Sequence, residues 1–206
     1  MQKIKYPKFI NIKDIEKIED VENQRLFKLT LPLKNSGKKR VLVITRAPKI
    51  SEYNGENSMT IRIIKYIKRN MDEYFKDIGF IDIVFLFPII EFEYSTLETV
   101  LAMEGEMFTV GNNGFCHNHN IIKNDEIIFQ SMIESNYIVL AWGEAPRGIK
   151  SIYDERIKYL LKGYKLIKIN TEDIKDLYVV GALTTYGYPK HCLAWRESDE
   201  LVSFDI

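Results

Sequence analysis

Cysteine and histidine are scarce in this 206-residue chain, which has two of the first and three of the second. Two cysteines are too few for a disulfide framework, so the class of small disulfide-stapled secreted domains is excluded. The opening residues, MQKIKYPKFI, lack the apolar core of a signal peptide. We therefore expect a cytoplasmic protein.

Long apolar runs and an excess of one charge are also missing. The longest apolar run, FIDIVFLFPII, is interrupted by Asp82 and Pro88 and falls short of the ~20 residues that cross a membrane. No membrane partner is expected. Basic and acidic residues number 29 each, so no net charge attracts nucleic acid. A local basic surface for nucleic acid is not excluded by this balance, but it is not favoured.

The composition is that of an ordinary globular protein, with 46% hydrophobic and 28% charged residues. The length supports one well-buried core, and no repeat or linker divides the chain. We expect one α/β domain over residues 1–206. Its first part, residues 1–23, is predicted to be a helical extension, because Ile12, Ile15, Ile18 and Val21 lie three apart among charges.

Apolar strands alternate with amphipathic helices in the rest of the chain. We predict adjacent, mostly parallel strands at 40–45, 80–87, 137–142 and 164–169, with 25–33 as an antiparallel hairpin partner of the first. A last strand is predicted within 176–183. Helices are predicted at 59–79, 126–136 and 151–163. This pattern is typical of a three-layer α/β sandwich with a mostly parallel central sheet and an antiparallel edge hairpin.

Polar, Gly- and Pro-containing segments follow the predicted strands. They are TRAPK, FPIIEFE and WGEAPRG, together with GYPKH near the end of the chain. Open α/β sheets bind ligands at the carboxyl ends of their strands. We therefore expect these segments to form one ligand site.

The same segments resemble the DUF1643 family, an uncharacterised bacterial and phage family, over residues 40–195. The resemblance rests on ITRAPK, NSMTIRI with Thr60 and Arg62, VFLFP, KNDEII, VLAWGEA and GYPKH, in that order. An Asn in the first turn of the family pattern is replaced here by Thr45 or Arg46, whereas Pro48 is retained. The layout is more loosely similar to the uracil-DNA glycosylase superfamily.

His191 and the pair Trp142–Gly143 are the first candidate site residues. An imidazole in a loop after a strand can donate a hydrogen bond to a ligand oxygen and titrates near neutral pH. The tryptophan offers a face for stacking a base, and the glycine permits close approach to a ligand. The alternatives are a structural histidine, a core tryptophan and a turn glycine.

Further candidates have the chemistry of anion binding. Arg46 and Arg147 follow strands and can bind a phosphate or carboxylate. Asn57 and Thr60 lie where a helix begins, at free backbone N–H groups. Arg62 lies one turn further and either reaches the site or pairs with a nearby acid.

A metal site and a cysteine nucleophile are weaker interpretations. The segment CHNH holds Cys116, His117 and His119, but this spacing matches no usual zinc motif. We predict no metal and no cofactor. A Cys–His pair would require Cys116 to meet His191, or Cys192 to meet a histidine of the CHNH segment.

Two functions remain open. The first is an enzyme that acts on a nucleotide, nucleoside or nucleobase, for example by hydrolysing a glycosidic bond. His191 would then stabilise the leaving base, Glu52 or Glu56 would position water, and Trp142 or Tyr53 would stack the base. The second is a non-catalytic module that binds a nucleotide-like ligand or a protein partner in the same cleft.

Overall fold

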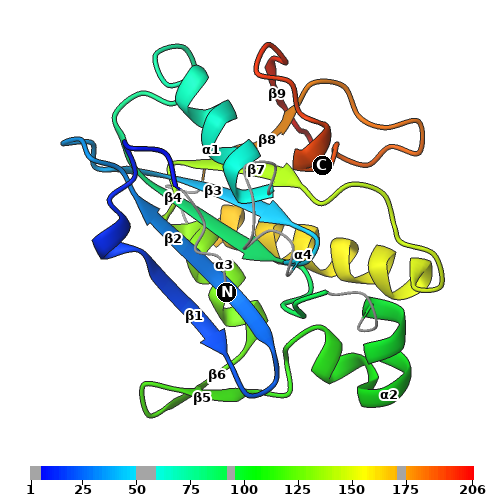
Figure 1. Cartoon of the computed structure of the whole chain (residues 1–206). Coiled ribbons are helices and arrows are strands. Elements are labelled where there is room, and N and C mark those ends of the chain that lie inside the picture. Colours follow the sequence, from blue (N-terminus) through cyan, green and yellow to red (C-terminus); the bar gives the residue numbers. More distant parts are fainter. Residues whose placement is uncertain (1–5, 50–58, 92–95, 171–174) are drawn as a thin grey trace.

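A seven-stranded sheet forms the middle layer of the protein (Figure 1). The computed structural model describes residues 6–49, 59–91, 96–170 and 175–206. The central strands β4, β3, β7 and β8 are parallel, and β1, β2 and β9 are antiparallel to their neighbours. In pairing order the strands are β1 (Glu16–Asp20), β2 (Arg25–Pro32), β4 (Ile78–Phe85), β3 (Lys39–Thr45), β7 (Tyr137–Ala141), β8 (Leu177–Val180) and β9 (Leu201–Ser203).

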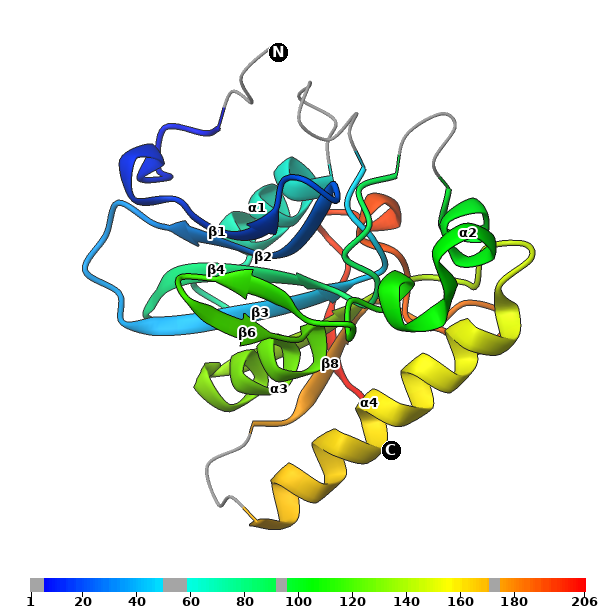
Figure 2. The same ribbon diagram turned by 90° about the horizontal axis from the view of Figure 1, so that it is seen from below.

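Helices cover both faces of the sheet (Figures 1 and 2). One hydrophobic cluster lies between the sheet and α1 (Met59–Arg69), with the short helix η3 (Cys192–Ala194) beside it. The other lies under α3 (Asn124–Glu134) and α4 (Lys150–Asn170). The remaining elements are η1 (Ile12–Asp14), α2 (Leu97–Thr109), β5 (Phe115–His117) and β6 (Asn120–Ile122). The predicted α/β class, with helices on both faces of a sheet that is parallel at its centre, is confirmed.

The strand β3 occupies the centre because it is apolar on both sides. Residues 41–45 are all buried, and β3 pairs in parallel with both β4 and β7. The predicted hairpin between 25–33 and 40–45 is therefore wrong, since β2 pairs with β4 instead. A strand with two apolar faces is best placed where helices cover both of them. The antiparallel hairpin at the sheet edge is β1–β2.

The N-terminal extension forms a strand where a helix was predicted. Of the residues of this extension that the structure describes, Ile12–Asp14 alone are helical, as a 3-10 turn, and β1 pairs along β2. Asp20 then accepts hydrogen bonds from the Arg25 guanidinium, with 2.7 Å between Nη2 and Oδ2. A short isolated helix is marginal in water because its first turn is costly. The unpaired edge of β2 offers backbone partners that such a helix lacks.

The predicted strand at 164–169 is also wrong, because α4 continues through it to Asn170. Leu160 and Tyr164 are buried one helical turn apart and extend the apolar face of the helix. Gly163 does not end the helix. A Cβ at this position would lie 2.4 Å from the Phe129 ring, so the glycine permits close packing of α3 on α4.

Other predicted elements agree with the structure. The predicted strands at 80–87 and 137–142 correspond to β4 and β7, and the last predicted strand corresponds to β8. The helix α1 ends at Arg69, ten residues before the predicted stop at Gly79. Asn70 explains this early end, because its side-chain amide donates to the carbonyl oxygens of Tyr66 and Glu197.

A buried carboxylate joins three strands of the sheet. Asp82 of β4 is fully buried and accepts hydrogen bonds from Thr30 of β2 at 2.6 Å and from Arg40 of β3 at 2.9 Å. The Nζ atom of Lys28 lies 3.7 Å from the same carboxylate. Each polar group in this cluster therefore depends on its neighbours, since a buried donor without an acceptor is costly.

We expect Asp82→Ala to lower the free energy of unfolding by about 2–3 kcal/mol, because Thr30 and Arg40 lose their common acceptor. Urea unfolding followed by circular dichroism measures the change. The triple variant Asp82→Leu, Thr30→Val, Arg40→Met removes the carboxylate and both of its hydrogen-bond donors, leaves Lys28 free to reach solvent, and should recover most of the loss. An Asp82→Ala variant as stable as the unmutated chain would contradict this account.

Candidate functional site

The candidate site lies where β3 and β7 end side by side. Thr45 and Ala141 are paired, so Arg46 and Trp142 follow at the same edge of the sheet. Arg46 reaches across from β3, and its Nη1 atom donates to the carbonyl oxygen of Glu144 at 3.4 Å. The end of one strand is thereby linked to the loop that follows the other.

Gly143 and His191 are in direct contact at this edge. Gly143 has φ = +72°, and a Cβ built on it would lie 2.7 Å from the Cβ of His191. No side chain fits between them. The glycine was predicted to allow approach of a ligand, but the segment that it admits is the chain's own loop before η3. The motifs WG and GYPKH are thus brought together by packing.

Tyr153 supports the same loop from beneath. Its buried hydroxyl lies 2.9 Å from the carbonyl oxygens of both Trp142 and Gly143 and donates to them. Burial raises the pKa of this phenol, and the nearby charge of Arg46 acts in the opposite direction. Tyr153 was not predicted as a site residue, because nothing in its helical segment indicates that the helix returns to the strand ends.

His191 is uncharged at neutral pH. Burial, followed by the positive charges of Arg46 and Lys49, lowers the pKa of His191 from 6.5 to about 4. Its Nδ1 atom accepts a hydrogen bond from the backbone N–H of Leu193 at 3.3 Å. The proton of the neutral ring is therefore assigned to Nε2. The histidine combines a structural role at η3 with one N–H donor that this bond does not use.

Trp142 belongs to the core, which corrects its predicted stacking role. The side chain is 1% exposed and lies in the cluster under α3 and α4, so neither ring face is open to a ligand. Its Nε1 atom and the Nε atom of Arg46 are both buried and make no hydrogen bond to any residue that the structure describes. Buried donors of this kind are uncommon. Two of them lie at this edge of the sheet.

The other predicted site residues are placed less favourably or cannot be placed. Thr60 is buried in the first turn of α1 at 5% exposed, Arg62 is half-buried on the same helix, and Arg147 is exposed beyond Gly143. The structure therefore brings together Arg46, Gly143 and His191. Four candidates lie outside the described residues, namely Glu52, Tyr53, Glu56 and Asn57.

The loop that carries His191 is also attached to α4. The Tyr188 hydroxyl donates to the Asp154 carboxylate at 2.5 Å, and Lys150 donates to both Asp154 and Tyr188. The Tyr188 ring packs edge-on against Tyr153, with 6.1 Å between the ring centroids. These contacts hold the loop near the two carbonyl groups that Tyr153 binds.

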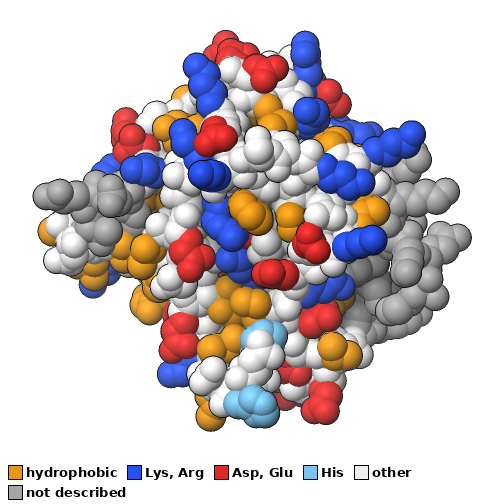
Figure 3. Space-filling model, turned by 90° about the vertical axis from the view of Figure 1, so that its left-hand side faces the viewer, with side chains coloured by type: hydrophobic (Ala, Val, Ile, Leu, Met, Phe, Trp, Pro, Cys, Tyr) orange, Lys and Arg blue, Asp and Glu red, His pale blue; other side chains and the backbone are white. Residues whose placement is uncertain are grey.

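The histidine-rich segment forms a separate hairpin. Cys116 and His117 lie in β5, which pairs with β6 and contacts β1. Histidine side chains show at the lower edge of Figure 3, where Figure 1 places this hairpin. Within the described ranges no three His, Cys, Asp or Glu side chains are grouped to hold a metal ion. Cys192 is fully buried, with Sγ 3.9 Å from Nδ1 of the adjacent His191.

No family model matches the chain, and neither a curated protein nor a solved structure matches it. Among the described residues, no helix has both the length and the apolarity that a membrane span requires. The function of the protein is therefore inferred from Arg46, Gly143 and His191 at the ends of β3 and β7.

We expect Gly143→Ala to be strongly destabilising. A left-handed backbone costs an L-residue roughly 1–2 kcal/mol, and the added methyl would also displace His191. We expect the free energy of unfolding to fall by about 3 kcal/mol in total. Gly187→Ala is the matched control, because Gly187 has φ = +80° but a methyl added to it would meet no atom within 4 Å. Equal losses in thermal or urea unfolding would contradict the steric argument.

The stability contributed by His191 should depend on pH in a defined direction. Its pKa in the folded protein, about 4, is below the ordinary 6.5, so on acidification the unfolded chain takes up the proton first. The contribution is present above about pH 6.5 and is lost as the pH falls towards 4, by about 3 kcal/mol in total. Urea unfolding of the unmutated chain and His191→Gln should give a difference that shrinks over this window. A difference that is constant with pH would contradict the assignment.

Proposed function

We propose that the protein binds a nucleotide, nucleoside or nucleobase where β3 and β7 end, and that it is an enzyme acting on this ligand. The observation that carries the proposal is that Arg46 and an uncharged His191 lie at one edge of the sheet, and that the buried Nε–H of Arg46 has no hydrogen-bond partner among the described residues. A guanidinium suits a phosphate or carboxylate, and a neutral imidazole N–H suits a carbonyl oxygen. A nucleotide presents both kinds of acceptor.

The reaction we propose is hydrolysis of a glycosidic bond. Water adds its oxygen to the anomeric carbon and gives up a proton to solvent. The bond to the base nitrogen breaks, its electron pair leaves with the base, and the base takes up a proton from solvent. The Nε2–H of His191 would stabilise the charge that develops on a base oxygen, which is the most effective place for a preorganised donor. Glu52 or Glu56 would position the water and Tyr53 would stack the base, and these three lie outside the described residues.

A non-catalytic binding module is the second candidate. It is favoured by the sequence at the end of β3, where Thr45 or Arg46 stands in place of the Asn of the family pattern. An arginine at this position still binds an anion, but its guanidinium does not take over a catalytic role of an asparagine amide. Long nucleic acid is the less favoured ligand, since basic and acidic side chains are interspersed on the face seen in Figure 3.

Ligand binding is tested by thermal unfolding with a nucleoside monophosphate, the nucleoside, the free base and the sugar. Ligand at ~100 times its dissociation constant adds about 2.7 kcal/mol to the free energy of unfolding. The first three should raise the melting temperature, and the sugar should not. Arg46→Gln should weaken binding of the monophosphate by roughly tenfold or more, and should weaken binding of the free base much less. Arg147→Gln, at an exposed arginine, is the control and should bind as the unmutated chain does.

Turnover is measured by chromatography of the released base. His191→Gln should bind the nucleoside nearly as well as the unmutated chain and release no base, if the histidine acts on developing charge. Binding without release by the unmutated chain would select the binding module. No shift in melting temperature with any compound would reject both the enzyme and the nucleotide-binding module, and would leave a protein partner as the ligand of the cleft.

A further inference from the structure

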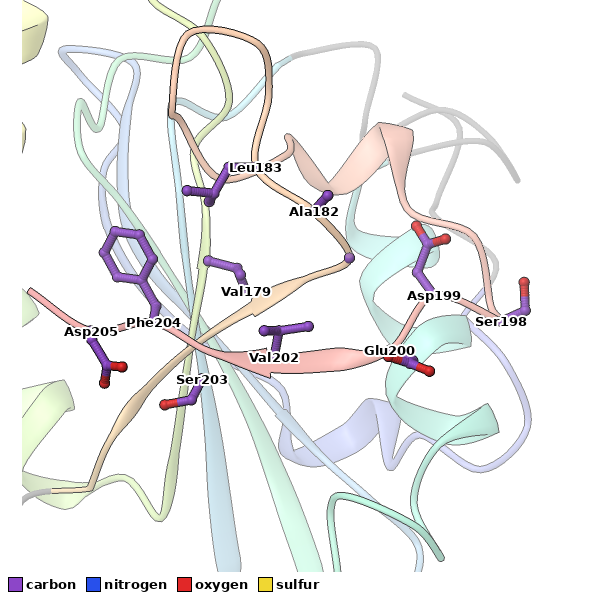
Figure 4. A pocket seen from close by; sticks show the side chains of 11 residues that line it. Val179, Ala182, Leu183, Ser198, Asp199, Glu200, Val202, Ser203, Phe204 and Asp205 are labelled. Atoms are coloured by element: carbon purple, nitrogen blue, oxygen red, sulfur yellow. The ribbon is translucent and has the colours of Figure 1, made fainter.

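A second feature lies at the opposite end of the sheet from β1. An open hollow of ≈ 700 Å³ is lined by β8, the residues that follow it, and β9. Figure 4 shows the apolar side chains gathered around one space, namely Val179, Leu183, Val202 and Phe204. Leu183 is 41% exposed and Val202 is 43% exposed, although both are aliphatic. Neither Arg46 nor His191 lines this hollow.

The outer side of β9 presents backbone groups. The Gly181 N–H donates to the carbonyl oxygen of Glu200, and the Phe204 N–H donates to the carbonyl oxygen of Leu177. The backbone groups of Glu200 and Phe204 therefore face the β8 side. By the alternation of an antiparallel pair, the backbone groups of Leu201 and Ser203 face outward. The Leu201 N–H binds the Tyr74 hydroxyl. No strand in the described part of the chain pairs with the groups of Ser203 on this side.

The two edges of the sheet differ in how they are protected. The edge strand β1 has the sequence EKIED, in which four of five residues are charged. Charged side chains on an edge strand discourage pairing with another chain. The other edge strand, β9, has the sequence LVS and carries no charge. The sheet is therefore protected on one side and open to pairing on the other.

The charged side chains that line the hollow are all of one sign. They are Asp199, Glu200 and Asp205, and no lysine or arginine is among the lining residues. Asp199 pairs with Lys190, 3.5 Å between Nζ and Oδ2. Glu200 and Asp205 are exposed at the two ends of β9 and form no ion pair with a described residue. A partner with positive charges at both ends of a short apolar segment would complement this surface.

We propose that β9 and the adjoining hollow bind an extended peptide in which basic side chains flank a short aliphatic segment. The segment adds as a strand, with backbone hydrogen bonds to Ser203. One or more of its aliphatic side chains enter the hollow beside Val202, and its basic side chains lie near Glu200 and Asp205. In strand addition the main-chain bonds supply affinity and the side-chain pocket supplies specificity.

A second copy of this chain fits the edge less well. Because both ends of β9 are acidic, pairing with another β9 in either direction sets acidic side chains against each other. Like charges across a strand pair are destabilising. The peptide interpretation is therefore preferred to a dimer.

The test uses two fluorescent peptides, one with a short valine segment flanked by lysines and one with the same segment flanked by glutamates. In anisotropy titrations the lysine peptide should bind and the glutamate peptide should not. The double variant Glu200→Lys, Asp205→Lys should weaken binding of the lysine peptide by about tenfold or more, because two charges that attract the peptide lysines are replaced by two that repel them. The variant Glu16→Lys, Glu19→Lys makes the same change in net charge on β1 and should leave binding unchanged.

Two further measurements address the mode of binding. Hydrogen exchange should show protection of the Ser203 amide when the lysine peptide is bound, and Val202→Asn should weaken binding while the melting temperature stays near that of the unmutated chain. Equal loss from the β1 variant would show non-specific charge attraction and overturn the proposal. An unprotected Ser203 amide in the peptide complex would also overturn it, as would a dimer of the unmutated chain in which the Ser203 amide is already protected without peptide.

Discussion

His191 packs so closely on Gly143 that no side chain could separate them. This contact brings the loop after β8 onto the end of β7 and sets the imidazole beside Arg46, the residue that follows β3. Its burial there, together with the positive charges of Arg46 and Lys49, keeps the ring neutral by lowering its pKa. Tyr153 holds the carbonyl group of Gly143 from the other side. The position, charge state and available N–H of the histidine all depend on this one close approach.

Much of the architecture follows from local pattern. The strands β3, β4 and β7 are short apolar runs bounded by turn residues, a pattern consistent with strands buried on both faces. Pairing is not local, so the insertion of β4 between β2 and β3 was not predictable from their neighbouring positions. Residues 164–169 show a second limit. Their apolar spacing suits a strand or a helix, and α4 continues through them with Gly163 packed against the Phe129 ring.

The site shows the same division between local and distant information. Arg46 and Gly143 could be predicted as neighbours, because both follow strands and strand ends meet at one edge. His191 could be assigned to that edge by its loop. The burial of Trp142 and the return of Tyr153 to the strand ends depend on how α4 packs, and the sequence near each residue carries no signal of it. Both are consequences of tertiary packing.

The contact between Gly143 and His191 also has a consequence for descent. A change to any larger residue at 143 would force the loop at 191 to move, and a loop that had already moved would free position 143 to vary. Relatives of this chain should therefore keep or lose the two motifs together, although many residues separate them. Covariation between the two positions would then record steric packing, and would be found in catalytic and non-catalytic descendants alike.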